Sequence, residues 1–261
     1  MSQPVRAKKH LGQHFLIDED AAGRIVGALD ANGYRDVVEI GPGTGVLSKY
    51  LLKREDIRTI LLDIDTESIT FLRKHYPAHS EQIVEADYLQ WNPATIFSGQ
   101  FAVIGNFPYN ISTQILFRVL EFRDRVPQVV GMFQEEVAVR IASRPGNRDY
   151  GILSVLMQAW YDVQLLLSLP QEAFQPPPKV RSAVIVCKRK DTEVPSCDEV
   201  LFKRVIKAAF NQRRKTLRNA LSSLVPKEQM AGLPYLELRA EALSWQQFEI
   251  LTNAVAQLPG N

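Results

Sequence analysis

Apolar residues in the first two thirds of the chain fall into two alternating patterns. Short apolar runs that end at a polar residue or a glycine predict buried strands. These runs occupy residues 36–40, 59–62, 82–85, 101–105, 129–133 and 163–169. Between them, apolar residues recur every three or four positions, which predicts amphipathic helices. The helices are expected after Asp18 and at residues 46–52, 66–75, 111–122, 134–141 and 151–159. Because strands alternate with helices, the pattern predicts an α/β fold around a parallel sheet.

The first predicted strand leads directly into a glycine-rich loop, residues 41–45. Its glycines permit a sharp turn and a close backbone approach to a ligand, and the next helix offers its N-terminus. Val46 stands where a dinucleotide-binding G-x-G-x-x-G motif has its third glycine, and no G-K-[ST] of a P-loop occurs in the chain. The spacing therefore favours the nucleoside-binding loop of methyltransferases that use S-adenosylmethionine (SAM).

Acidic residues follow the second and third predicted strands. Asp63 can accept hydrogen bonds from both hydroxyls of a ribose, and Asp87 can accept one from the exocyclic amine of an adenine. An Asp after a strand is equally common as a plain turn residue, so that alternative stays open. A calcium loop beginning at Asp63 is excluded, because Ser68 and Lys74 replace the glycine and the glutamate that it needs.

The fourth predicted strand ends in a turn that carries an amide and two aromatic rings. Asn106, Phe107, Pro108 and Tyr109 follow the apolar run, and Pro108 cannot continue a strand because it lacks the N–H group. Ligands bind at the carboxyl ends of strands in open α/β sheets, so the turn is predicted to hold a planar base for chemistry. On these residues alone, an ordinary turn is the alternative.

The composition narrows the class of protein. Hydrophobic residues make up 46% and charged residues 23% of the chain, as in ordinary globular proteins. No apolar run suits a membrane span or a signal peptide, so a cytoplasmic protein without membrane contact is expected. The only cysteines are Cys187 and Cys197, and no metal site is expected, because Pro77 separates His75 from His79.

Two regions of the last third are basic. Three prolines at residues 176–178 predict a stiff extended arm that presents Phe174, Lys179 and Arg181. The composition turns polar after Lys190, which predicts a boundary between domains at residues 1–190 and 191–261. Residues 201–220 then hold seven basic residues and no acidic one, which indicates a polyanionic partner, although a solvated helix face is the alternative.

Five segments together resemble the ribosomal RNA adenine dimethyltransferase family, and most closely its bacterial small-subunit branch. They are residues 11–16, 39–45, 106–112, 174–180 and 209–215, and they follow the order of the family over nearly the whole chain. The resemblance implies a Rossmann-like SAM-dependent methyltransferase domain, a small helical C-terminal domain and a monomer. It implies methylation of N6 on two adjacent adenosines in the 3′-terminal hairpin loop of 16S rRNA in the assembling small subunit.

The resemblance also implies roles for single residues. Asn106 and the Phe107 carbonyl would accept the two N–H bonds of the target amine, with Pro108 stiffening the turn and with Tyr109 and Phe174 stacking on the base. Cofactor contacts would come from His14, Leu16, Gly41, Gly43, Asp63, Asp87 and Asn106. RNA contacts would come from Lys179, Arg181, Arg213, Arg214, Lys215 and Arg218. His14 and Phe107 depart from the residues most common in the family, Asn and Leu or Ile.

Two other functions stay open at this point. The large-subunit rRNA adenine methyltransferases that confer antibiotic resistance share the same core motifs, and residues 210–215 favour the small-subunit enzyme over them. A non-catalytic ribosome-assembly or nucleic-acid-binding factor is the other alternative, which the intact Asp63 and Asn106 disfavour.

Overall fold

The computed structural model describes residues 5–259, and backbone contacts divide the chain into two compact units. Unit 1 comprises Met1–Ala138 and Gln164–Arg189, and unit 2 comprises Val139–Val163 and Lys190–Asn261. The predicted division kept residues 139–163 with the sheet. Backbone contacts group them instead with the C-terminal helices, because α6 (Ile152–Trp160) packs against α7 (Glu199–Asn211) and α9 (Trp245–Ala256), although residues 161–163 begin a strand of the sheet. Residues 1–4 and 260–261, at the ends of the predicted domains, lie outside the described residues.

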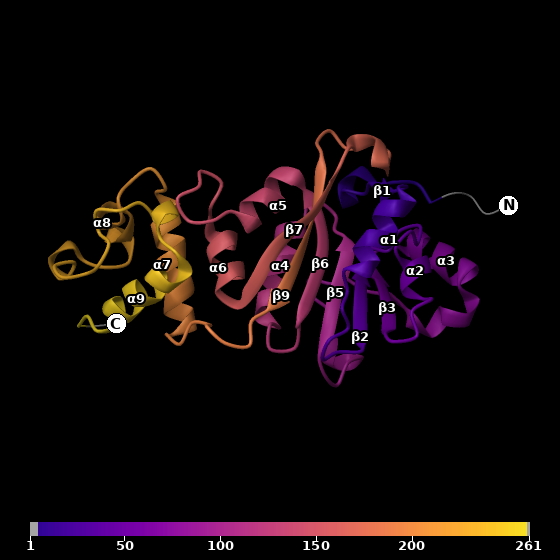
Figure 1. Cartoon of the computed structure of the whole chain (residues 1–261), viewed down its shortest axis with the longest axis horizontal. Coiled ribbons are helices and arrows are strands. Elements are labelled where there is room, and N and C mark those ends of the chain that lie inside the picture. Colours follow the sequence, from indigo (N-terminus) through magenta and orange to yellow (C-terminus); the bar gives the residue numbers. More distant parts are fainter. Residues whose placement is uncertain (1–4, 260–261) are drawn as a thin grey trace. The chain divides into compact units, whose positions relative to one another are not determined.

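A seven-stranded sheet with the order β4-β3-β2-β5-β6-β9-β7 forms the centre of unit 1 (Figure 1). Its strands are β2 (Asp36–Ile40), β3 (Arg58–Asp63), β4 (Ile83–Glu85), β5 (Phe101–Asn106), β6 (Gln128–Gln134), β7 (Tyr161–Leu169) and β9 (Ser182–Arg189). The neighbours from β4 to β6 pair in parallel, as predicted. β9 pairs antiparallel with β6, and it is not among the strands predicted from the sequence.

The helices of unit 1 agree closely with the apolar periodicity. They are α1 (Glu19–Gly27), α2 (Ser48–Leu51), α3 (Thr66–His75), α4 (Ser112–Glu121) and α5 (Glu135–Ala142), which runs on into unit 2. Short 3₁₀ helices are η1 (Lys9–Leu11), η2 (Pro77–Gln82), η3 (Pro93–Thr95) and η4 (Gln171–Ala173). Asp18 caps α1 as expected, since its carboxylate accepts a hydrogen bond from the Ala21 N–H at 2.9 Å.

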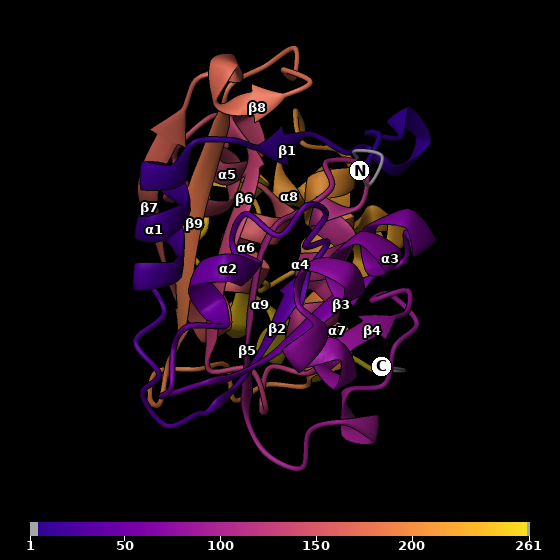
Figure 2. The same cartoon turned by 90° about the vertical axis from the view of Figure 1, so that its right-hand side faces the viewer.

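One face of the sheet packs against α1 and α2, which lie in front of the strands in Figure 2. Ile25 of α1 and Leu51 of α2 share a fully buried cluster with Ala102 and Ile104 of β5. Alternate residues of a strand point to opposite faces, so this packing fixes which side chains of β5 face each layer. The arrangement holds the carboxyl end of β5 at a defined place.

A two-stranded sheet that the sequence did not predict joins two distant segments of unit 1. β1 (Phe15–Leu16) pairs antiparallel with β8 (Phe174–Gln175), with Leu16 opposite Phe174. Each strand has only two residues, too few for an alternating pattern to be visible in the sequence. The N-terminal segment is thereby attached to the proline-rich segment.

Unit 2 is helical around an aromatic core. Its elements include α6, α7, α8 (Leu217–Ala220), α9, η5 (Leu221–Ser223), η6 (Lys227–Gln229) and η7 (Ala240–Ala242). Phe202 of α7 packs edge-to-face against Trp160 of α6, with ring centroids 5.9 Å apart. None of the helices in residues 5–259 is long and apolar enough to cross a membrane.

Candidate active site

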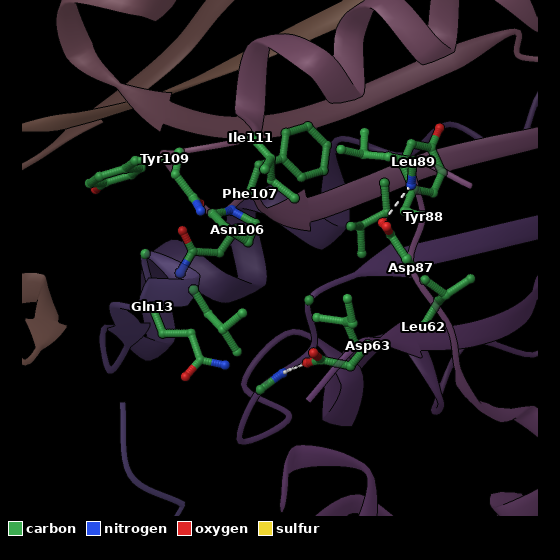
Figure 3. A pocket seen from close by; sticks show the side chains of 18 of the residues that line it. Gln13, Leu62, Asp63, Asp87, Tyr88, Leu89, Asn106, Phe107, Tyr109 and Ile111 are labelled. Carbon is green, nitrogen blue, oxygen red and sulfur yellow. Dashed lines mark hydrogen bonds between the residues drawn. The ribbon is translucent and has the colours of Figure 1, made fainter. Parts of the chain in front are cut away.

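A pocket lies at the carboxyl ends of β2, β3, β4 and β5 (Figure 3). The strand order reverses at β2, because β3 and β4 lie on one side of it and β5 and β6 on the other. Such a reversal creates the crevice in which open α/β sheets bind ligands. Lining the pocket are the predicted residues His14, Gly41, Gly43, Asp63, Asp87, Asn106, Phe107, Pro108 and Tyr109.

The glycine loop presents backbone rather than side chains to this pocket. Gly41 and Gly43 have φ angles of 67° and 54°, a left-handed conformation that favours glycine. A Cβ atom on Gly43 would lie 2.7 Å from a ring carbon of Phe15, so the N-terminal segment could not rest on the loop. The glycines therefore permit both the sharp turn and the close approach of residue 15.

Asp63 is anchored by backbone amides at the end of β3. Its carboxylate accepts hydrogen bonds from the N–H groups of Gly43 at 3.2 Å and Asp65 at 2.9 Å. Only 5% of the residue is exposed, and this burial raises the pKa of the carboxyl above its usual value although the two amides oppose the shift. Each oxygen keeps a second lone pair, so Asp63 can accept two hydroxyl groups of a ligand.

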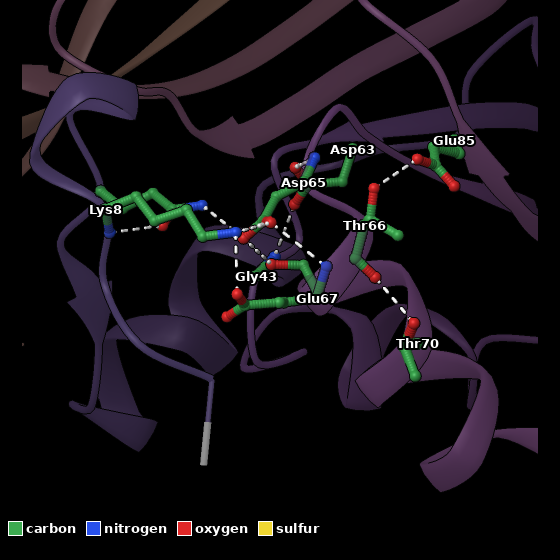
Figure 4. A network of polar contacts seen from close by, with 10 residues as sticks. Lys8, Gly43, Asp63, Asp65, Thr66, Glu67, Thr70 and Glu85 are labelled. Carbon is green, nitrogen blue, oxygen red and sulfur yellow. Dashed lines mark hydrogen bonds and ion pairs between the residues drawn. The ribbon is translucent and has the colours of Figure 1, made fainter. Parts of the chain in front are cut away.

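Asp65 connects the N-terminal segment to the pocket wall, which the sequence did not reveal (Figure 4). Its carboxylate accepts hydrogen bonds from Lys8 Nζ at 2.5 Å and Gln13 Nε2 at 3.2 Å. Burial works against ionisation here, but these contacts hold the pKa of Asp65 below its usual value. Asp65 also caps α3, because its carboxylate accepts a hydrogen bond from the Glu67 N–H. For the contact between Asp65 and the N-terminal segment, the only signal in the sequence was that Gln13 lies within the motif at residues 11–16.

Asp87 lines the pocket and also forms a local turn. One carboxylate oxygen accepts the Leu89 N–H at 2.9 Å, and the other accepts the Gln90 side-chain amide at 3.0 Å. The turn alternative and the ligand-binding role are thus compatible, because each oxygen can accept a further hydrogen bond. Tyr88 beside it was not predicted, and its buried hydroxyl has no hydrogen-bond partner among the described residues.

The amide of Asn106 has a defined orientation. Its Nδ2 donates a hydrogen bond to the backbone carbonyl of His14 at 2.7 Å. Because a carbonyl oxygen can only accept, the NH₂ group must face His14 and Oδ1 must face the other way. No described residue donates a hydrogen bond to Oδ1, so this oxygen is available to a ligand.

The other residues of the turn are fixed by neighbours in unit 1. Phe107 is 1% exposed, and its N–H donates to the Met132 carbonyl at 3.3 Å. The Tyr109 hydroxyl lies 2.5 Å from Ser182 Oγ, and burial raises the pKa of this phenol although Ser182 opposes the shift. The His14 ring stacks on Tyr109 with centroids 5.4 Å apart, while His14 Nδ1 donates to the Pro176 carbonyl at 2.8 Å.

Two of the predicted site residues do not face the pocket. Leu16 and Phe174 are each 2% exposed and belong to the core cluster beneath α1. The expectation that a rigid arm presents the Phe174 ring is wrong, because pairing of β1 with β8 places this segment against the core. Only the backbone of Leu16 remains for contact with a ligand, and Phe174 would have to leave the core to stack on a base.

The predicted RNA-binding cations differ in their exposure and in whether they already pair with another group of the protein. Lys179 and Arg181 are exposed in unit 1, and Arg181 pairs with Glu135 at 3.4 Å. In unit 2, Arg213 donates to the Arg148 carbonyl, and Arg218 pairs with Glu237.

The sequence window 201–220 missed the acidic partner of Arg218, because Glu237 lies outside it. Arg214 and Lys215 are exposed, and no ion pair involves them within the described part of the chain. They follow the end of α7 at Asn211, so they lie on a loop and not on a helix face. Residues 5–259 contain no group of three or more His, Cys, Asp or Glu side chains suited to a metal ion.

Comparison with known proteins places these features in context. A family model described as "Ribosomal RNA adenine dimethylase" matches residues 5–247. The chain is 51% identical to a ribosomal RNA small subunit methyltransferase A of Cytophaga hutchinsonii, over 97% of this chain and 99% of the relative. It is 48% identical to the protein of the same name from Flavobacterium johnsoniae, over 97% of each chain.

Solved structures show the same fold. A dimethyladenosine transferase from Plasmodium falciparum has a TM-score of 0.79 at 23% identity, over 94% of this chain and 99% of the other. The 23S rRNA methyltransferase ErmE has a TM-score of 0.67 at 23% identity, over 93% of this chain and 100% of the other. The predicted Rossmann-like methyltransferase fold is confirmed.

Proposed function

Because the chain belongs to the ribosomal RNA adenine dimethylase family, we propose that it methylates N6 of two adjacent adenosines in the 3′-terminal hairpin loop of 16S rRNA. The methyl groups come from SAM, and the substrate is the assembling small ribosomal subunit. The observation that carries this proposal is the amide of Asn106, which His14 orients so that an unpartnered oxygen is left at the carboxyl end of β5. Such an oxygen suits a neutral amine as its ligand.

The pocket has the groups that SAM needs. Asp63 would hold the ribose hydroxyls, Asp87 would accept from the adenine amine, and the loop at Gly41 and Gly43 would allow the ligand to lie against backbone. His14 and the Leu16 backbone would complete this side of the site. Bound SAM supplies an electrophilic methyl group on a sulfonium for in-line transfer.

The residues of the turn must make a poor nucleophile reactive. The N6 lone pair of adenine is delocalised into the ring, so the amine needs a change of geometry rather than a strong base. For the first transfer, Asn106 Oδ1 and the Phe107 carbonyl would accept hydrogen bonds from the two N–H groups of the amine and draw the nitrogen towards a tetrahedral arrangement. As the nitrogen bonds the methyl group, the S–CH₃ bond breaks and its electrons stay on the sulfur, and the cationic nitrogen then loses a proton to water. One N–H group remains for the second transfer. Tyr109 would stack on the adenine, an interaction worth about 1–3 kcal/mol per base. The target base must be unpaired or flipped out of its stack to reach this site.

Cations of both units would hold the RNA through its phosphates. They are Lys179, Arg181, Arg213, Arg214, Lys215 and Arg218. Phosphate contacts make affinity fall steeply with salt. Replacing both Arg214 and Lys215 by Ala should weaken binding to the subunit. It should also lower the magnitude of the slope of log K against log salt concentration by about two, since binding releases about one counterion fewer for each lost phosphate contact. Lys227→Ala, an exposed lysine elsewhere in unit 2, is the control, and equal binding by the two variants would remove the loop from the RNA interface.

Methyl transfer from labelled SAM to unmethylated small subunits, followed by mapping of the product, tests the function itself. Asn106→Ala should lower kcat by about 100-fold or more, as loss of one preorganised polar contact does in other enzymes, while SAM binding changes little. The exposed Asn32→Ala is the control. Near-normal turnover of Asn106→Ala would refute the mechanism.

The same assay separates the alternatives. Product mapped to large-subunit RNA would instead assign the activity of ErmE, whose fold this chain shares. No methylation by the wild type, together with tight binding to immature subunits, would assign an assembly factor. The proposal places the enzyme in the bacterial cytoplasm as a monomer, so a mass in solution near 29.5 kDa is expected.

A further inference from the structure

Two glycines on adjacent strands enclose the ring of Phe107, the residue after Asn106 in the turn. Gly105 of β5 and Gly131 of β6 are direct partners in the parallel ladder. A Cβ atom built on Gly131 would lie 2.4 Å from Cε2 of Phe107, and one on Gly105 would lie 2.9 Å from Cε1. Neither glycine has a positive φ angle, so their backbone conformation does not require glycine. The space that they leave is occupied by the ring.

The ring is held on its remaining sides as well. Phe133 packs edge-to-face against it, with ring centroids 5.3 Å apart, and Phe107 is 1% exposed. The Phe107 N–H donates to the Met132 carbonyl of β6 at 3.3 Å. Ring and amide of Phe107 are thus both attached to β6, the strand beside its own. Close packing leaves the ring one place to lie, and this determines where the rest of the residue lies.

We propose that Gly131 is a positioning residue for methyl transfer. With Gly105 it forms a slot for the Phe107 ring. The ring in this slot holds the Phe107 carbonyl oxygen where it accepts a hydrogen bond from an N–H group of the target amine. The inference rests on the proposed function for the role of that carbonyl. The steric part, that residues 107 and 131 compete for one space, rests on the distances alone.

Gly131 is a better site for a test than Gly105. A Cβ atom on Gly105 would lie 2.5 Å from the backbone oxygen of Ile40, so any substitution there disturbs the pairing of the sheet. At Gly131 the nearest atoms are ring carbons of Phe107 and Phe133, at 2.4 and 2.8 Å. A methyl group at residue 131 therefore acts on the rings. A shorter side chain at residue 107 should relieve the closer of these two contacts.

The experiment compares the wild type with Gly131→Ala, Phe107→Leu and the double variant. Gly131→Ala should lower kcat for methylation of small subunits at least tenfold, with KM and the Kd for SAM changed less than threefold. The double variant should regain part of that loss, because leucine lacks the Phe107 ring carbon that the new methyl group meets at 2.4 Å, while the contact with Phe133 at 2.8 Å remains. Gly99→Ala is the matched control, since no atom lies within 4 Å of its new methyl group. Its kcat should equal that of the wild type.

Thermal unfolding of the four proteins measures the competition for space without a substrate. Gly131→Ala should lower Tm, and Phe107→Leu should restore part of the loss.

A normal kcat of folded Gly131→Ala, or a double variant no more active than Gly131→Ala, would overturn the positioning role. If the Tm change of the double variant equals the sum of the changes in the two single variants, residues 107 and 131 do not compete for one space, and the slot is refuted. If Gly131→Ala does not fold, the double variant must fold and methylate, or the inference fails. A wild type inactive on small subunits would refute the proposed function alone, because the Tm cycle still reports on the slot.

Discussion

The two sides of the pocket are built from different chemistry. On the side of β3, Asp63 and Asp65 are buried carboxylates whose oxygens accept hydrogen bonds from backbone amides and from Lys8. On the side of β5, Asn106 is a neutral amide held by a single hydrogen bond to His14, and the turn that follows carries no charged side chain up to Ile111.

This difference separates binding from chemistry. We call the side of β3, with Asp63 and Asp65, the acidic side, and the side of β5, with Asn106, the neutral side. A buried charge needs several hydrogen-bond partners, so the carboxylates of the acidic side are held in a network of hydrogen bonds. A neutral amide needs only orientation, which leaves its oxygen available at little cost in stability. We therefore expect changes on the acidic side to alter affinity for SAM, and changes on the neutral side to alter turnover.

Asp63→Asn should give the largest effect on affinity. Hydrogen bonds to a charged group contribute about 1.5–3 kcal/mol each, so loss of the charge should weaken SAM binding about 10- to 100-fold. At saturating SAM, kcat should fall much less than in Asn106→Ala. Calorimetric titration with SAM and steady-state kinetics measure the two quantities.

Asp56→Asn, an exposed carboxylate that pairs with Arg54, serves as the control and should leave the Kd for SAM unchanged. If Asp63→Asn kept its affinity for SAM and lost turnover instead, the assignment of SAM binding to the side of β3 and of turnover to the side of β5 would be wrong.

Much of this site could be predicted because its parts lie at strand ends. The strands and helices of unit 1 have strong periodicity, and Asp63, Asp87 and Asn106 each follow an apolar run. A parallel sheet brings such ends to one edge, so their meeting in one pocket follows from the pattern.

Contacts between distant segments could not be predicted from the same pattern. The pairing of Leu16 with Phe174 and the bond from Lys8 to Asp65 depend on segments far apart in sequence, with no periodicity of their own. The buried Phe174 ring is the clearest case, because an aromatic residue beside prolines and cations gives no sign of which way it faces. Grouping of residues 139–163 with unit 2 likewise depends on helix packing.

Glu39→Gln should change how the stability of the protein depends on pH. Glu39 lies behind the acidic side, 2% exposed, and accepts a hydrogen bond from Ser48 Oγ at 2.6 Å. Burial raises its pKa to about 8, with Ser48 opposing and the charge of Asp63 adding to the shift. The folded protein then keeps a proton that the unfolded chain releases above its ordinary pKa of 4.5. Stability should therefore fall as pH rises from 4.5 to 8 and level off above that range, with a slope of at most about 1.4 kcal/mol per pH unit.

Urea unfolding between pH 5 and 8 measures this slope in the wild type and in Glu39→Gln. Glutamine cannot ionise, so the variant should lose the part of the slope that Glu39 contributes and gain stability relative to the wild type at pH 8. Parallel curves for the two proteins would mean that Glu39 is ionised in the folded state, and the acidic side would then hold one more charge than we infer.

Lys8→Met should give the smallest effect and tests whether the N-terminal segment belongs to the acidic side. Lys8 Nζ contacts Asp65 at 2.5 Å and Glu67 at 3.2 Å, but Asp65 keeps Gln13, Ser68 and a backbone amide as partners when the lysine is gone. Partly exposed ion pairs contribute little, so the Kd for SAM should rise only about threefold, and less at high salt. Lys53→Met, an exposed lysine of the same unit, should change nothing. If Lys8→Met lowered kcat without altering the Kd, the segment would act on the catalytic turn through His14 instead, and the boundary between the two sides would run along residues 8–14.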